Sequence, residues 1–285
     1  MISERVPSLD SSLSFLILGQ RIQVDCPDPA LRRLVSANFG MMATVSEWSP
    51  PDLHYRGESG DVAGSFCLTR DGQATIAAAD ACDFLYWLEK DITVELQKRR
   101  SDLFFLHSAA IEWRGKACLF AAEPGSGKST TTWALLHHEF RYLSDELSPI
   151  DLNTMRVFPY SHALCLKQHS LITYPFPKEV IELGRTIHVP PRALPADTIS
   201  ESRSLGAVFL VKYHPELETP EIRQISPAEG SARLYANTLN ALAHNNRGLD
   251  AVVQIAEHVP CFTVSSAELG ATAMMIRSTV EQVVV

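Results

Sequence analysis

The chain has 285 residues, of which 46% are hydrophobic and 20% charged, a composition typical of a soluble globular protein with one or two domains. A formal net charge of −8 excludes a generally basic surface that would recruit nucleic acid, although it is compatible with a local basic pocket. No apolar run approaches about 18 residues and no basic-plus-apolar signal opens the chain, so we expect a cytoplasmic protein without membrane partners.

The cysteines are scattered, form no C-x-x-C pair and mostly lie within apolar runs. They are Cys26, Cys67, Cys82, Cys118, Cys165 and Cys261. This distribution predicts reduced thiols rather than a disulfide framework or a cysteine metal site.

The hydrophobic pattern and turn signals in the first third of the chain predict a small α+β unit. Its expected elements, in chain order, are a polar stretch at 1–13, two strands within 14–26 around Gly19-Gln20, a helix over 29–38 capped by Asp28, a loop at 47–62, strands at 65–69 and 74–78 around Asp71-Gly72, and a helix over 79–99. Residues 1–100 contain no charged constellation that suggests chemistry. We therefore expect them to form a separate N-terminal domain that packs against, or presents substrate to, a domain of residues 101–285.

A β-hairpin is expected at the start of the second domain. A strand over 103–113, a turn at Arg114-Gly115-Lys116 and a strand over 117–121 follow one another directly. Strands joined by a tight turn are antiparallel, whereas the usual nucleotide-binding sheet is parallel and its strands are joined by helices. The second domain is therefore expected to be an α/β (α+β) fold with a mixed β-sheet.

The second strand of this hairpin leads into a phosphate-binding loop of the Walker A type. The residues expected to bind the nucleotide are Glu123, Pro124, Gly125, Ser126, Gly127, Lys128, Ser129 and Thr130. Backbone N–H groups of such a loop point at the phosphates of ATP, Lys128 would reach the β- and γ-phosphates, and the Ser129 hydroxyl would hold Mg²⁺. The strict pattern begins with glycine where this chain has Ala122, which fits if that position does not need a positive φ.

Two further signals surround this loop. Asp145-Glu146 follows a short strand at 141–144 and lies 17 residues after Lys128, where an acid can coordinate Mg²⁺ or take a proton from an attacking hydroxyl. Conventional ATPases place their acidic strand much further along the chain. His107 lies on the strand adjacent to the one that enters the loop. This position makes His107 a stronger candidate for a functional residue than an ordinary strand histidine.

The rest of the chain is expected to form mostly structural elements without a chemical role. The expected elements are helices over 128–138, 226–245, 249–258 and 268–283, strands over 157–166, 205–213 and 261–265, and a long loop over 170–204. Arg185, Arg192 and Arg203 lie in or next to that loop, where an arginine can close over a transferred phosphoryl group.

From Leu106 to Asp151 the sequence resembles the catalytic domain of HPr kinase/phosphorylase and its HPr-kinase-related relatives, which belong to the phosphoenolpyruvate-carboxykinase-like class of phosphate-loop proteins. The family pattern of histidine, hairpin, loop, helix and two acids is matched by His107, Gly125-x-Gly127-Lys128-Ser129 and Asp145-Glu146. Ala122 and Glu146 fit the related-kinase branch better than the true HPr kinases. The E-x-R-G-x-G signature of the latter is absent, so HPr itself is not the expected substrate.

The resemblance implies an ATP- and Mg²⁺-dependent kinase that phosphorylates a hydroxyl, most naturally a serine, of a protein or peptide. Asp145 would be the general base, assisted by His107, with Lys128 on the phosphates and Ser129 and Glu146 near Mg²⁺. Self-association would be consistent with the hexameric HPr kinases. Two alternatives stay open: a nucleotide-binding regulatory or assembly module without phosphoryl transfer, and a small-molecule kinase. A GTPase is disfavoured because the chain has no N-K-x-D.

Overall fold

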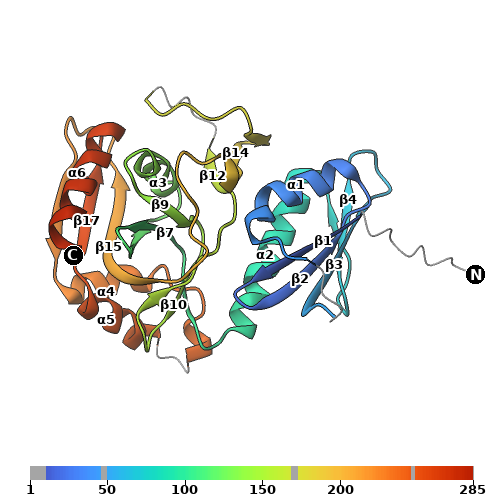
Figure 1. Ribbon diagram of the computed structural model, residues 1–285, viewed down its shortest axis with the longest axis horizontal. Helices are drawn as coiled ribbons and strands as arrows, with labels where there is room; N and C mark the ends of the chain where they lie inside the picture. Colours follow the sequence, from blue (N-terminus) through green and yellow to red (C-terminus); the bar gives the residue numbers. More distant parts are fainter. Residues whose placement is uncertain (1–10, 46–49, 168–172, 245–247, 285) are drawn as a thin grey trace, which may run out of the picture.

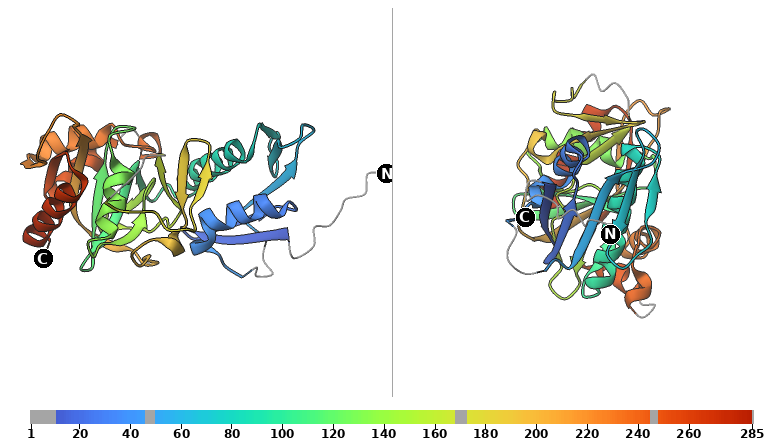
Figure 2. Two further views of the ribbon diagram at one scale, coloured as in Figure 1. Left: turned by 90° about the horizontal axis from the view of Figure 1, so that it is seen from above. Right: turned by 90° about the vertical axis from the view of Figure 1, so that its right-hand side faces the viewer.

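The computed structural model describes residues 11–45, 50–167, 173–244 and 248–284 and shows a mixed α/β fold. Two parts lie side by side, the N-terminal elements in one and the larger share of the chain in the other (Figure 1, and from two further sides in Figure 2). Residues 1–10 of the predicted polar stretch lie outside the described residues. Residues 47–49, 170–172 and 245, which belong to other predicted elements, also lie outside them.

The N-terminal part is a five-stranded sheet in the order β1-β2-β3-β4-β5, with two helices packed on one face. Its elements are β1 Ser12–Ile17, β2 Gln20–Asp25, α1 Pro29–Phe39, the 3₁₀ turn η2 Gly40–Met42, β3 Leu53–Ser59, β4 Phe66–Arg70, β5 Ile76–Ala78 and α2 Ala81–Arg99. Strands β1 and β2 are antiparallel, whereas β2 and β3 are parallel and α1 forms the crossover between them.

Except for β3, the strands and helices of this part lie where local sequence signals predicted them. The Asp28 carboxylate accepts hydrogen bonds of 2.8 and 2.9 Å from the backbone N–H groups of Ala30 and Leu31, which caps α1. The β1–β2 turn and the β4–β5 turn contain Gly19 and Gly72, both at positive φ. The two hairpins and both helices predicted for this part are confirmed.

The predicted loop over 47–62 is wrong, because β3 occupies Leu53–Ser59. Leu53, Tyr55 and Gly57 alternate along the strand and face the core, while polar residues between them face outward. A Cβ atom at Gly57 would lie 2.7 Å from the ring of Phe84 on α2. Glycine is therefore a packing requirement here and not the mark of a loop.

The larger part is built on a nine-stranded mixed sheet with helices on both faces. Seven of its strands follow the order β6-β10-β11-β15-β8-β7-β9, and β17, outside this path, pairs with both β15 and β16. The elements are β6 Phe104–Leu106, β7 Ser108–Trp113, β8 Lys116–Ala121, α3 Lys128–Leu136, β9 Arg141–Ser144, β10 Ser148–Asp151, β11 Arg156–Val157, β15 Arg203–Tyr213, β16 Glu221–Ile225, α4 Pro227–Tyr235, η4 Ala241–His244, α5 Gly248–His258, β17 Cys261–Ser266 and α6 Leu269–Val283.

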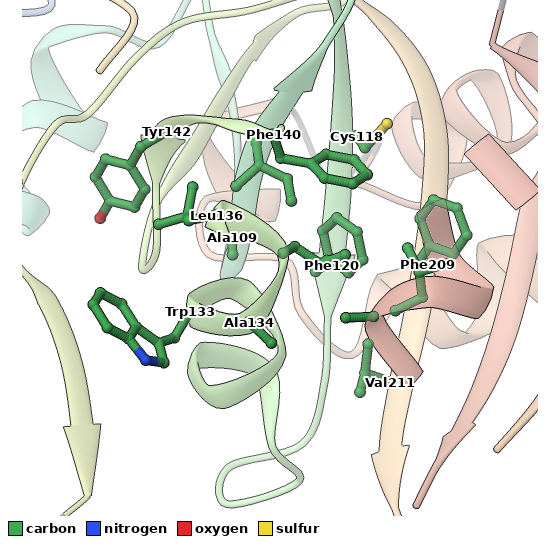
Figure 3. Close-up of a cluster of buried hydrophobic side chains, with 14 of the residues drawn as sticks. Ala109, Cys118, Phe120, Trp133, Ala134, Leu136, Phe140, Tyr142, Phe209 and Val211 are labelled. Carbon is green, nitrogen blue, oxygen red and sulfur yellow. The ribbon is translucent and has the colours of Figure 1, made fainter. Parts of the chain in front are cut away.

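The predicted hairpin is confirmed, since β7 and β8 pair antiparallel. Strand β15 pairs parallel with β8 and with β17, so the sheet is mixed as expected. Helices α3 and α6 pack on one face and α4 and α5 on the other. Figure 3 shows Trp133 and Leu136 of α3 among the aromatic side chains of the first face.

Four expectations for this part need correction. The strand predicted over 103–113 is broken at His107 into β6 and β7, which pair with different neighbours. The strand predicted over 157–166 is β11 followed by an irregular segment and then β12, Leu164–Lys167. Helix α4 ends at Tyr235 rather than near residue 245, because its last turn is followed by the segment that pairs with β6. Strand β16 was not predicted.

The predicted loop over 170–204 also contains structure. Strands β13 (Ile181–Leu183) and β14 (Thr186–Val189) form a small antiparallel sheet with β12, and η3 spans Pro191–Ala193. Gly184-Arg185 is the turn of this hairpin, with Gly184 at φ 57°. In Figure 1, β12 and β14 lie between the two parts of the molecule.

The two parts share apolar contacts. Phe105, Leu147 and Tyr160 from the larger part are buried in the same cluster as the inner faces of α1 and α2. A division into two domains between residues 100 and 101 stays a prediction.

All six cysteines are free thiols, and Cys26, Cys118 and Cys261 are fully buried. None of the described helices has both the length and the apolar character needed to cross a bilayer.

Candidate active site

Residues 122–127, here called the glycine loop, connect β8 to α3. Gly125 and Gly127 have φ values of 82° and 90°, in the left-handed region that favours glycine. Ala122 is not among the residues with positive φ, so its methyl group is tolerated at the first position. The Ser126 N–H donates to the Glu123 carbonyl at 3.0 Å, which closes the turn before the helix begins.

The first two residues of α3 hold the carboxylate of Asp145. The Lys128 Nζ lies 3.1 Å from Asp145 Oδ1 and also donates to the backbone carbonyl of Asp145. The Ser129 hydroxyl donates to Asp145 Oδ2 at 2.7 Å. The Asp145 side chain is fully buried, and only 9% of the Lys128 side chain is exposed. Each carboxylate oxygen of Asp145 therefore has its own hydrogen-bond donor at the N-terminus of α3, the helix that follows the glycine loop.

Glu146 and His107 form the outer layer of the same cluster. The Glu146 Oε1 lies 3.9 Å from Lys128 Nζ, and its Oε2 lies 3.0 Å from His107 Nε2. Their side chains are 43% and 33% exposed, so this layer is open to solvent. The structure thus brings together all the residues that the sequence proposed for catalysis and metal binding.

The sheet explains why these residues meet. Strand β9 ends at Ser144, so Asp145 is delivered at the carboxyl end of β9, two strands away from β8. Strand β7 lies between them and runs antiparallel to both, which places its first residues at that same edge. His107 directly precedes β7 and therefore lies between the glycine loop and Asp145 along the edge.

The two acids have opposite electrostatic environments. Burial raises the pKa of Asp145, and Lys128 lowers it by less. Burial also acts to raise the pKa of Glu146, but Lys128 and His107 overcome it and bring this pKa to about 2. The pKa of Lys128 is raised, because Asp145 and Glu146 outweigh the opposing effect of burial. Two neighbouring carboxyl groups whose pKa values are shifted in opposite directions are a pattern typical of acid–base sites.

Sequence reasoning missed a second polar pair near this cluster. His162 is 4% exposed, and its Nε2 lies 2.7 Å from Oε1 of Glu89 on α2. Burial lowers the pKa of His162, but Glu89, Glu146 and Asp145 raise it overall. The N-terminal part thus contributes Glu89 to the electrostatic surroundings of the site. No local signal marks the pair, because the two residues are 73 positions apart in the sequence.

The structure places one of the three arginines of the predicted loop, Arg203, away from the glycine loop. Arg203 begins β15, next to the start of β8, whereas the glycine loop follows the other end of β8. Its guanidinium pairs with Glu201 at 3.1 Å instead. Arg185 and Arg192 are in the β13–β14 turn and in η3, and their side chains have no described ion pair at the site.

Within the described part of the chain, no three His, Cys, Asp or Glu side chains converge to form a metal site by themselves. A cavity of about 240 Å³ lies elsewhere, in the N-terminal part. It is lined by Pro50, Pro51, Asp52, Leu53, His54, Arg70, Asp71 and Arg99. None of the candidate residues lines it.

No protein-family model matches the chain, and no curated protein matches it. Among solved structures, the chain is similar to the Hpr(Ser) kinase/phosphatase from Coxiella burnetii. The two are 12% identical, the match covers 62% of this chain and 88% of the other, and the TM-score is 0.34. This is a distant structural relation, which does not identify a function.

Proposed function

We propose that the protein is an ATP- and Mg²⁺-dependent kinase that transfers the γ-phosphoryl group to a hydroxyl, most naturally a serine hydroxyl, of a protein or peptide. The observation that supports this best is the buried Asp145 carboxylate, held by Lys128 and Ser129 of the helix that follows the glycine loop. Binding a nucleotide needs only the loop and the helix N-terminus. A buried acid with a raised pKa at the same place indicates proton transfer.

In this proposal the glycine loop is a phosphate-binding loop. Its backbone N–H groups and the N-terminus of α3 would receive the β-phosphate, and Lys128 would contact the β- and γ-phosphates. In the structure Lys128 Nζ lies 3.1 Å from the Asp145 carboxylate. Phosphate oxygens compete for that ammonium group, so nucleotide binding frees one oxygen of the Asp145 carboxylate.

The transfer step uses that freed oxygen. The acceptor hydroxyl oxygen forms a bond to the γ-phosphorus, the bond from this phosphorus to the β–γ bridging oxygen breaks, and ADP leaves. Asp145 takes the proton of the hydroxyl. Ser129 at 2.7 Å keeps the carboxylate oriented during the step.

The residues present also fit Mg²⁺. Magnesium prefers oxygen ligands and usually binds through one or two protein groups together with substrate phosphates and water, so a cluster of three protein ligands is not needed. The Ser129 hydroxyl and the Glu146 carboxylate would hold the ion, and His107 orients Glu146 from 3.0 Å. When bound, Mg²⁺ neutralises charge on the transferred phosphoryl group.

The test uses γ-labelled ATP with Mg²⁺ and separate protein, peptide and small-molecule fractions of a cell extract. Acid-stable, alkali-labile label in the protein or peptide fraction supports the proposal, because phosphoserine has these properties. Label confined to the small-molecule fraction indicates the small-molecule kinase instead. ATP binding by calorimetry without transfer to any fraction favours a regulatory nucleotide-binding module.

A further inference from the structure

Two exposed side chains border the two left-handed glycines of the glycine loop. A Cβ atom at Gly125 would lie 3.4 Å from Lys167 Nζ, and one at Gly127 would lie 3.5 Å from Tyr213 Cβ. Tyr213 is also tied to the loop through its backbone, since its N–H donates to the Ser126 carbonyl at 3.1 Å. About half of Tyr213 is exposed. The ammonium group of Lys167 and the backbone and Cβ atom of the half-exposed Tyr213 therefore lie against the loop, and neither residue has a part in the chemistry proposed above.

The strand order gives the loop two different sides. Along the sheet the order is β15-β8-β7-β9, and β15 is parallel to β8. Tyr213 ends β15 and Asp145 follows β9, so both lie at the carboxyl-end edge to which β8 brings the loop. Asp145 is on one side of the loop and Tyr213 is on the other. Their strands are three spacings apart, roughly 14 Å.

A nucleoside triphosphate has only one productive direction across such a site. Its γ-phosphate must face Asp145, because the acceptor hydroxyl loses its proton there. The nucleoside then extends from the loop toward the end of β15. The distance between the two sides is one that a triphosphate and a ribose together can span.

We propose that Tyr213 stacks on the base of the bound nucleotide and that Lys167 contacts its phosphates. This assignment rests on the proposed function. An exposed aromatic ring beside a phosphate site offers every base a π-face, and a flexible lysine supplies a point charge for phosphate oxygens. The base would therefore be held by stacking rather than by hydrogen bonds that read its edge.

Inorganic tripolyphosphate separates the two contacts, because it has the phosphates of ATP but no base. Dissociation constants of the full chain for ATP and for tripolyphosphate, both with Mg²⁺, are measured by calorimetry. Tyr213→Ala is expected to weaken ATP binding by at least about fivefold and to leave tripolyphosphate binding unchanged. Tyr213→Phe keeps the ring and is expected to bind both as the wild type does. Lys167→Ala is expected to weaken both ligands together.

Each outcome distinguishes this inference from the proposed function. If the wild type binds neither ligand, the proposed function fails. If the wild type binds both and Tyr213→Ala changes neither, or weakens both equally, the stacking role is wrong, since an equal loss means that Tyr213 only supports the loop. A Lys167→Ala variant that still binds tripolyphosphate with native affinity overturns the phosphate contact.

Discussion

Asp145→Asn is the sharpest perturbation of the proposed site, because it removes one charge and almost no volume. In the native protein Asp145 Oδ1 lies 3.1 Å from Lys128 Nζ, and Oδ2 accepts from Ser129 at 2.7 Å. The amide keeps one oxygen acceptor but cannot take a proton. Loss of a general base lowers the transfer rate by about 10²- to 10⁴-fold, or ~3–5 kcal/mol of transition-state free energy.

The same change has a calculable effect on stability. Leaving a buried charge without its partner typically costs about 3–5 kcal/mol. In the variant, Lys128 still has two partners, the backbone carbonyl of residue 145 and Glu146 Oε1 at 3.9 Å. Burial also makes the charged form of Asp145 costly in the native protein, so less is lost when that charge is removed. The expected loss is therefore smaller, about 2 kcal/mol, which corresponds to a fall in Tm of about 3 °C for a chain of this length. ATP affinity is expected to stay the same or to rise, since phosphates no longer compete with the carboxylate for Lys128.

The assay compares wild type, Asp145→Asn and the control Asp61→Asn, which makes the same charge change at an exposed residue. Transfer of label from γ-labelled ATP, ATP affinity and Tm are measured on each protein. The control is expected to match the wild type in all three. A folded Asp145→Asn protein that transfers phosphate at the native rate would falsify the assignment of Asp145 as the base. Loss of both transfer and ATP binding would show that the residue only maintains the loop.

Three further changes test other parts of the argument. His107→Ala removes the 3.0 Å partner of the Glu146 carboxylate and is expected to raise the Mg²⁺ concentration for half-maximal transfer by about 10- to 100-fold, measured by Mg²⁺ titration. Glu112→Gln weakens the contacts of 2.5 and 2.7 Å to Arg141 and is expected to cost about 1 kcal/mol in urea denaturation at neutral pH, since solvent screens part of the interaction. Gly57→Ala places a methyl group 2.7 Å from the Phe84 ring and is expected to cost about 1–3 kcal/mol.

The Glu112 change also has a signed pH dependence. Burial acts to raise the pKa of Glu112, but Arg141 and the Gly115 N–H lower it below its ordinary value. The carboxylate therefore stabilises the fold above its unfolded-state pKa of about 4.3, and this contribution is lost as the pH falls through the lower native value. The stability difference between wild type and Glu112→Gln should shrink as the solution is acidified. A difference that is constant from pH 7 to pH 3 would contradict the proposed ion pair.

Features set by a few neighbouring residues could be predicted from the sequence. The Asp28 cap, the Asp71-Gly72 turn and the β7–β8 hairpin all depend on contacts within a few positions along the chain. The proximity of Lys128 and Asp145 could also be predicted from the sequence. Only one short helix and one strand separate the two residues, which leaves the chain little freedom in where it returns to the sheet. The chemical roles of these two residues stay proposals.

Features set by distant partners could not be predicted. Strand β3 contains a glycine because a phenylalanine 27 positions away in α2 fills the space above it. Edge strand β16 has mostly exposed or half-buried side chains, so it lacks the alternation that marks a strand with one buried face. The contact between Glu89 and His162 depends on how the N-terminal part packs against the larger one. In each case the deciding interaction lies outside any window that a local pattern can cover.

The antiparallel hairpin explains why all the residues of the proposed site can lie at one edge of the sheet. In a purely parallel sheet every strand reaches the functional edge by its carboxyl end, and the residues that precede strands lie at the opposite edge. Because β7 runs the other way, His107 reaches the same edge as the glycine loop and Asp145. From β15 to β9 the edge then offers an aromatic ring, a loop rich in N–H donors, a histidine and a buried acid. In the proposed orientation the base of the nucleotide lies toward β15 and its γ-phosphate toward Asp145, and the reversal of β7 adds His107 to the same edge.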